Sequence, residues 1–198
     1  MNKMEKINKS KWQNSSQTNN SQTHYYDRLY KDTKFDVQYP VLDIGGGNGS
    51  FLDFIKVKEA DILDLDGFDY ILPNYNFIET DLTKELPNLN KKYKTIFIME
   101  TLEHLHNPLY LLANARKYLE ESGCIYISVP YTPLFIKYEH ELDMHVCRWT
   151  DKELEDQCKK LGYETEWIVK RRRFKDTAFW LPHCFLILKL KLKEVKNG

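Results

Sequence analysis

Short apolar runs alternate with amphipathic stretches along most of the chain, and the two patterns predict different elements. The runs are rich in β-branched and aromatic residues, as expected for buried strands, whereas the amphipathic stretches repeat their apolar residues at helical spacing. The last two runs favour an antiparallel hairpin that closes the fold. The expected strands are 41–44, 60–66, 75–82, 95–99, 124–131, 163–169 and 184–192, and the expected helices are 50–58, 107–123 and 150–161.

Local signals set the boundaries of two of these helices. Asn107 and Pro108 open the second helix, and Gly123 is expected to end it. Thr150, with Glu153 three residues later, forms a capping box that opens the third. Gly162 is expected to end that helix.

The first 23 residues differ in composition from the rest of the chain. They are rich in Asn, Ser, Gln and Lys, with Trp12 almost alone as a large apolar group. Such a stretch buries too little apolar surface to order itself, so a flexible N-terminal segment is expected. Residues 24–198 are expected to form a single domain, because this length supports one sizeable core.

Charge and cysteine content narrow the class of protein. The 198 residues carry a formal net charge of +0, whereas binding to nucleic acid or to an anionic membrane usually needs a basic excess. No apolar run in the sequence reaches the roughly 18 residues of a membrane span. The four cysteines include no C-x-x-C pair. We interpret them as reduced thiols of a cytoplasmic protein.

A glycine-rich turn follows the first expected strand and is the first candidate binding site. Gly45, Gly47 and Gly49 give it the spacing G-x-G-x-G, and Asp43 precedes them by two residues. Glycine permits positive φ and lets the backbone approach a ligand closely. A dinucleotide fingerprint reads G-x-G-x-x-G and places pyrophosphate on the turn. A carboxylate at Asp43 would repel that anion and would suit a ligand with a cationic ammonium group.

This D-x-G-x-G-x-G segment, followed by E-x-L-E-H at 100–104 and by a Trp-Thr-x-x-Glu-Leu helix start at 149–154, makes a combined pattern. Over about residues 25 to 192 the chain resembles the class I methyltransferases of the small-molecule type. The resemblance implies an α/β Rossmann-like fold, a doubly wound, mostly parallel seven-stranded sheet with a C-terminal antiparallel strand and helices on both faces. It also implies S-adenosylmethionine as methyl donor and S-adenosylhomocysteine as product.

The resemblance also assigns residues to parts of the cofactor. Asp43 and the backbone at Gly45, Gly47 and Gly49 are expected to hold the methionine part. Asp66 is expected to bind the ribose, in preference to Asp64 two residues earlier, because the family's acid ends this strand. The remaining expected cofactor contacts are Asp81 and Leu82 at the adenine, and Glu100.

Methyl transfer requires alignment of a nucleophile with the methyl carbon, and an oxygen nucleophile also needs a proton acceptor. Histidine suits this role near neutral pH, which makes His145 the first candidate, followed by His140 and His104. A metal at His140, Glu141, Asp143 and His145 is an alternative, but their spacing matches no specific site, so no metal is expected. The expected substrate contacts are Tyr26, Tyr131 and Arg148.

The resulting hypothesis is O-methylation of a small, anionic metabolite, either phosphorylated or linked to a sugar or nucleotide. Arg148 supports an anionic acceptor, and no nucleic-acid or membrane partner is expected. Three alternatives remain open. The first is a nicotinamide-dependent enzyme, which the glycine spacing and Asp43 oppose. The others are a non-catalytic S-adenosylmethionine-binding module for assembly with a partner, and a protein or RNA methyltransferase.

Overall fold

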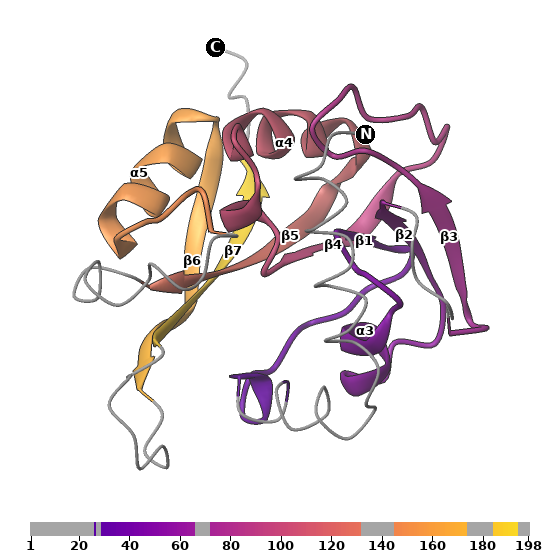
Figure 1. Cartoon of the computed structure of the whole chain (residues 1–198), viewed down its shortest axis with the longest axis horizontal. Coiled ribbons are helices and arrows are strands. Elements are labelled where there is room, and N and C mark those ends of the chain that lie inside the picture. Colours follow the sequence, from indigo (N-terminus) through magenta and orange to yellow (C-terminus); the bar gives the residue numbers. More distant parts are fainter. Residues whose placement is uncertain (1–25, 27–28, 66–71, 132–144, 174–183, 194–198) are drawn as a thin grey trace, which may run out of the picture.

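A computed structural model describes residues 26, 29–65, 72–131, 145–173 and 184–193. They form one seven-stranded sheet in the order β3-β2-β1-β4-β5-β7-β6 (Figure 1). The strands are β1 Val41–Ile44, β2 Ala60–Asp64, β3 Tyr75–Glu79, β4 Tyr93–Met99, β5 Leu119–Tyr131, β6 Tyr163–Arg173 and β7 Cys184–Leu192.

The strand directions confirm the doubly wound architecture. β1 lies parallel to β2 and β4, β2 to β3, and β4 to β5. β7 runs antiparallel to both β5 and β6, which confirms the expected C-terminal hairpin. Figure 1 shows α4 (Pro108–Ala115) and α5 (Asp151–Lys160) on one face of the sheet and α3 (Ser50–Phe54) on the other. The helices therefore cover both faces, as predicted.

The alternation of side chains along β4 divides the core between the two faces. Ile96 and Ile98 belong to a buried cluster that includes the apolar side of α4, whereas Phe97 faces a second cluster with Phe51 of α3. The second cluster is aromatic: the rings of Phe51 and Phe97 lie 5.3 Å apart, and that of Tyr126 stacks on Phe97 at 5.5 Å. Both faces are thus sealed, as a parallel sheet requires.

Two expected helices end earlier than the sequence suggested. α3 stops at Phe54, and Lys56 already has a positive φ of 61°. α4 stops at Ala115, a short 3-10 turn (η2, Arg116–Tyr118) follows, and β5 begins at Leu119. The prediction that Gly123 ends the helix is wrong, because this glycine lies inside β5. A Cβ there would come within 3.0 Å of the backbone oxygens of residues 93 and 94, so the glycine permits close approach of β4.

The third helix begins and ends as expected. Thr150 and Glu153 form the complete capping box at the start of α5, and Gly162 follows its end with a φ of 84°. In the described part of the chain, none of the helices has the length and apolar character needed to span a bilayer.

Candidate functional site

Acidic side chains gather where the parallel strands end. Asp43 lies on β1, Asp64 is the last residue of β2, and Glu100 follows β4 directly. Because parallel strands present their carboxyl ends at one edge of the sheet, ligands of such folds bind there. The candidate site is therefore the crevice expected outside the carboxyl ends of β1, β2 and β4.

The glycine turn is held in place by bonds to the end of β2. Gly45 N–H donates to the carbonyl oxygen of Leu63 at 2.7 Å, and Gly47 N–H donates to Asp64 Oδ2 at 2.7 Å. Gly45 has a φ of 81°, and a Cβ on it would lie 2.3 Å from Thr101 Oγ1. The turn therefore packs against the segment that follows β4, and a larger residue at position 45 would separate the two.

Asp43 is a deeply buried carboxylate beside the glycine turn. Only 1% of the residue is exposed, and neither carboxylate oxygen has a hydrogen-bond partner among the described residues. Burial, and then the nearby negative charge of Asp64, raise the pKa of Asp43 well above its usual value. The carboxylate lies against Gly46, where a Cβ would come within 2.6 Å of Oδ2. An unpaired buried anion is costly, so this group is suited to a ligand that brings a cation.

Asp64, rather than Asp66, is the acid that ends the second strand. The expected strand reached residue 66, but β2 stops at Asp64, whose carbonyl oxygen accepts a bond of 2.7 Å from Thr80 N–H. Its carboxylate accepts bonds from Gly47 N–H and Leu65 N–H, both at 2.7 Å. Burial raises the pKa of Asp64 and these two bonds oppose the shift. Asp66 itself lies outside the described residues.

Tyr26, near the N-terminal end of the domain, packs on the helix that follows the glycine turn. Its ring lies 5.9 Å from that of Phe51 and 5.9 Å from that of Phe54 in α3. Burial raises the pKa of Tyr26, with further contributions from the negative charges of Asp43 and Glu100. The phenol is therefore close to both carboxylates, where the sequence placed a substrate contact.

Glu100 is held rigidly at the end of β4. It has a positive φ of 50°, which is unusual for a residue with a side chain. Its N–H donates to Ser128 Oγ at 3.0 Å, and the Ser128 hydroxyl donates back to Glu100 Oε1 at 2.6 Å. Ser128 is fixed in turn by the Tyr30 hydroxyl at 2.9 Å. Sequence analysis missed both partners, since they lie 28 or more residues away along the chain.

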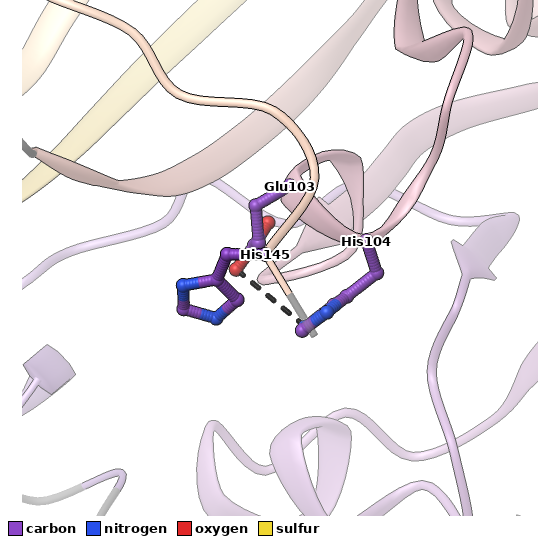
Figure 2. A group of neighbouring side chains, drawn as sticks. All are labelled: Glu103, His104 and His145. Atoms are coloured by element: carbon purple, nitrogen blue, oxygen red, sulfur yellow. Dashed lines mark ion pairs between the residues drawn. The ribbon is translucent and has the colours of Figure 1, made fainter. Parts of the chain in front are cut away.

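Beside this crevice, Glu103, His104 and His145 form a cluster of potential ligands or bases (Figure 2). Glu103 and His104 belong to a 3-10 turn, η1 (Leu102–His104), and His145 precedes α5. The rings of the two histidines are 4.9 Å apart, and His104 Nε2 is 3.9 Å from Glu103 Oε1. The structure thus brings together two of the three histidines that the sequence proposed.

Burial also shifts the pKa values in this cluster. It raises the pKa of Glu103 well above its usual value, and the nearby Glu100 carboxylate adds to the shift. It lowers the pKa of His145, and the positive charge of Arg148 adds to that shift. An uncharged His145 keeps a lone pair on one ring nitrogen at neutral pH.

Comparison with known proteins shows the family to which the chain belongs. Residues 15–166 match the family model described as a methyltransferase domain, which is more than half of the chain. The chain belongs to this methyltransferase family. No curated protein matches the sequence.

Solved structures of low sequence identity share the methyltransferase's fold. A methyltransferase of Haloferax volcanii in complex with the activator Trm112 is 15% identical with a TM-score of 0.64, over 90% of this chain and 96% of that chain. A SAM-dependent methyltransferase of Thermotoga maritima is 15% identical with a TM-score of 0.61, over 87% and 92%. CalO1 of calicheamicin biosynthesis, in its SAH-bound form, is 16% identical with a TM-score of 0.60, over 87% and 54%.

The remaining predicted residues of the methyltransferase lie in varied surroundings. Asp81 sits in a turn, where Thr83 donates to it and Lys84 Nζ lies 3.0 Å away. Burial alone would raise the pKa of Asp81, but these contacts outweigh burial and lower it. Leu82 is buried in the core, and Tyr131 ends β5 beside Trp149. Their cofactor and substrate contacts stay predictions. His140, Glu141 and Asp143 lie outside the described residues.

Proposed function

We propose that this methyltransferase binds S-adenosylmethionine in the crevice at β1, β2 and β4 and methylates an oxygen of a small, anionic acceptor. The observation that carries the proposal is the Asp43 carboxylate, buried, unpartnered among the described residues and set against the glycine turn. The methionine ammonium supplies the positive charge that this carboxylate needs. A pyrophosphate would instead add negative charge next to Asp43.

The donor set of the crevice fits the other parts of the cofactor. Asp64 ends β2 about 20 residues after the start of the glycine turn, the separation at which an acid accepts bonds from ribose hydroxyls. The turn itself presents backbone close to the ligand, as Gly45 and Gly47 allow. When bound, S-adenosylmethionine supplies a methyl group activated by its sulfonium charge.

The acceptor is proposed to enter beside Glu103, His104 and His145. An oxygen nucleophile must lose its proton at some stage of the transfer, and these groups next to the crevice can assist. Tyr26, whose ring packs against Phe51 and Phe54, is proposed to cover the turn, and Arg148, exposed near His145, is proposed to attract an anionic group. Tyr131, at the end of β5, is the proposed wall of the acceptor site.

The test is a transfer assay with S-adenosylmethionine labelled in its methyl group. The full chain is incubated in turn with a metabolite extract, a protein fraction and an RNA fraction, and label is counted in each. We expect label in the metabolite fraction, and its loss on competition with S-adenosylhomocysteine. Label that appears only in protein or RNA would overturn the small-molecule assignment. Cofactor binding without label in any fraction would indicate a non-catalytic module.

A further inference from the structure

We propose that Glu103, His104 and His145 bind a divalent transition-metal ion, and that the ion activates the acceptor oxygen. Each residue offers one ligand atom, and all three atoms lie within 4.8 Å of one another. Figure 2 shows the three side chains next to one another, Glu103 and His104 from η1 and His145 from the segment before α5. The sequence favours no metal, because it places His145 close to residues 140–143, whose spacing matches no specific site. Only the fold brings His145 next to the E-x-L-E-H segment.

The buried carboxylate is the main reason for the proposal. Glu103 is 1% exposed, and its Oε2 has no hydrogen-bond partner among the described residues. The neighbouring His104 Nε2 is 3.9 Å from the other oxygen, which is too long for a hydrogen bond. Glu100 adds a second carboxylate close by. Buried anions of this kind are stable when they are paired or coordinate a metal ion.

The backbone holds the two segments of the cluster together. The Glu103 carbonyl oxygen accepts bonds from Val146 N–H at 2.8 Å and Cys147 N–H at 3.0 Å. His145 is therefore fixed next to η1 although it lies about 40 residues further along the chain. A metal ion is held by such ligands at about 2.0–2.2 Å, which requires the three atoms, now within 4.8 Å of one another, to approach by up to about 1.4 Å. Rotation of the two partly exposed imidazole rings can supply this movement.

The ligand types select the class of ion. Two imidazole nitrogens with one carboxylate oxygen suit zinc, cobalt, iron or nickel, whereas magnesium and calcium prefer ligand sets made of oxygen. Three protein ligands leave coordination positions open, which is the arrangement of catalytic rather than structural sites. The structure therefore supports a site at which an exogenous oxygen completes the coordination.

The role of the ion rests on the proposed function. The acceptor hydroxyl binds the ion, which lowers its pKa, and the proton passes to solvent. The resulting oxygen anion forms a bond to the methyl carbon as the carbon–sulfur bond breaks, leaving the methylated acceptor and neutral S-adenosylhomocysteine. His145 then acts as a ligand of the ion, in place of the proton acceptor expected from the sequence.

The experiment titrates the metal-free full chain with Co²⁺ alone, followed by visible absorption and by calorimetry. We expect one equivalent to bind, with the d–d absorption bands of a site that has nitrogen and oxygen ligands. His145→Ala and Glu103→Gln should weaken Co²⁺ binding roughly tenfold or more. His106→Ala is the matched control: this histidine is exposed, two residues from His104, and outside the cluster, so Co²⁺ affinity should not change.

Binding of S-adenosylhomocysteine is measured on each variant in parallel, and it reports folding independently of the metal. Absence of saturable Co²⁺ absorption would overturn the metal site. So would a Co²⁺ affinity in His145→Ala and Glu103→Gln equal to that of the wild type. Strong sulfur-to-cobalt charge-transfer bands would also overturn it, because they would show binding to a cysteine thiolate. In each case retained S-adenosylhomocysteine binding leaves the proposed function standing, whereas its loss in the wild-type chain refutes that function instead.

Discussion

Replacement of Asp43 by asparagine should have opposite effects on cofactor affinity and on the stability of the free protein. Asparagine keeps the shape of the side chain and removes the charge. In the free protein the carboxylate is 1% exposed and unpartnered among the described residues, so its charge stabilises nothing there. In the complex the same charge is proposed to contact the methionine ammonium.

The expected loss of affinity follows from that charged contact. A hydrogen bond to a charged group contributes about 1.5–3 kcal/mol, so Asp43→Asn should weaken S-adenosylhomocysteine binding roughly 10- to 150-fold. The assay is calorimetry with two ligands. Methylthioadenosine has the adenosine and sulfur but lacks the ammonium and carboxylate, so its affinity should change by less than about twofold.

The stability effect has a defined pH dependence. Burial, and then Asp64, raise the pKa of Asp43 in the folded state. An acid with a raised folded-state pKa stabilises the fold only when protonated, so the wild type loses stability as the pH rises above the unfolded value of about 3.9. The melting temperature of Asp43→Asn should therefore match that of the wild type near pH 4 and exceed it at pH 7 to 8.

Two results would refute this reasoning. If Asp43→Asn weakened S-adenosylhomocysteine and methylthioadenosine equally, the carboxylate would support the turn rather than the ammonium. If the variant were less stable than the wild type at pH 7, Asp43 would have a stabilising partner in solution.

Three further predictions concern other sites. Asp64→Ala should weaken S-adenosylhomocysteine binding by about 1–3 kcal/mol, because the ribose and Gly47 N–H both lose an acceptor. An unchanged affinity in calorimetry would exclude Asp64 as the ribose contact. Asp61→Ala should lower the free energy of unfolding by about 2–4 kcal/mol, because Lys91 and Tyr93 each lose a bond of 2.7 Å. Burial alone would raise the pKa of Asp61, but these donors outweigh burial and lower it. Urea titrations should therefore show the stability difference between variant and wild type above pH 4, and this difference should shrink as the pH falls through the folded-state pKa. Thr150→Ala should cost about 1 kcal/mol in the same titrations through loss of the capping box, and a change below a few tenths would contradict it.

The parts of the fold that the sequence predicted best are those set by local interactions. The limits of β1 were correct because an apolar run stops at glycines that need positive φ. The start of α5 was correct because Thr150 and Glu153 satisfy each other within one turn. The order of strands and helices followed from the same kind of local pattern.

The sequence-based predictions were wrong or incomplete where contacts between segments distant along the chain determine the local structure. The end of β2 depends on its pairing with β3, where Asp64 lies opposite Glu79, and nothing near Asp66 in the sequence reveals this. Gly123 ends no helix, because its role is to let β5 approach β4. Glu103 and His145 lie together because backbone bonds between distant segments link η1 to the segment before α5.

We propose above all that the carboxylate before the glycine turn selects a ligand with a cationic amino-acid part over a diphosphate. Calorimetry of the full chain with S-adenosylhomocysteine and, separately, with NAD tests it most directly. We predict saturable one-to-one binding of S-adenosylhomocysteine and no measurable binding of NAD at the same concentrations. Tighter binding of NAD, or no binding of S-adenosylhomocysteine at all, would contradict it.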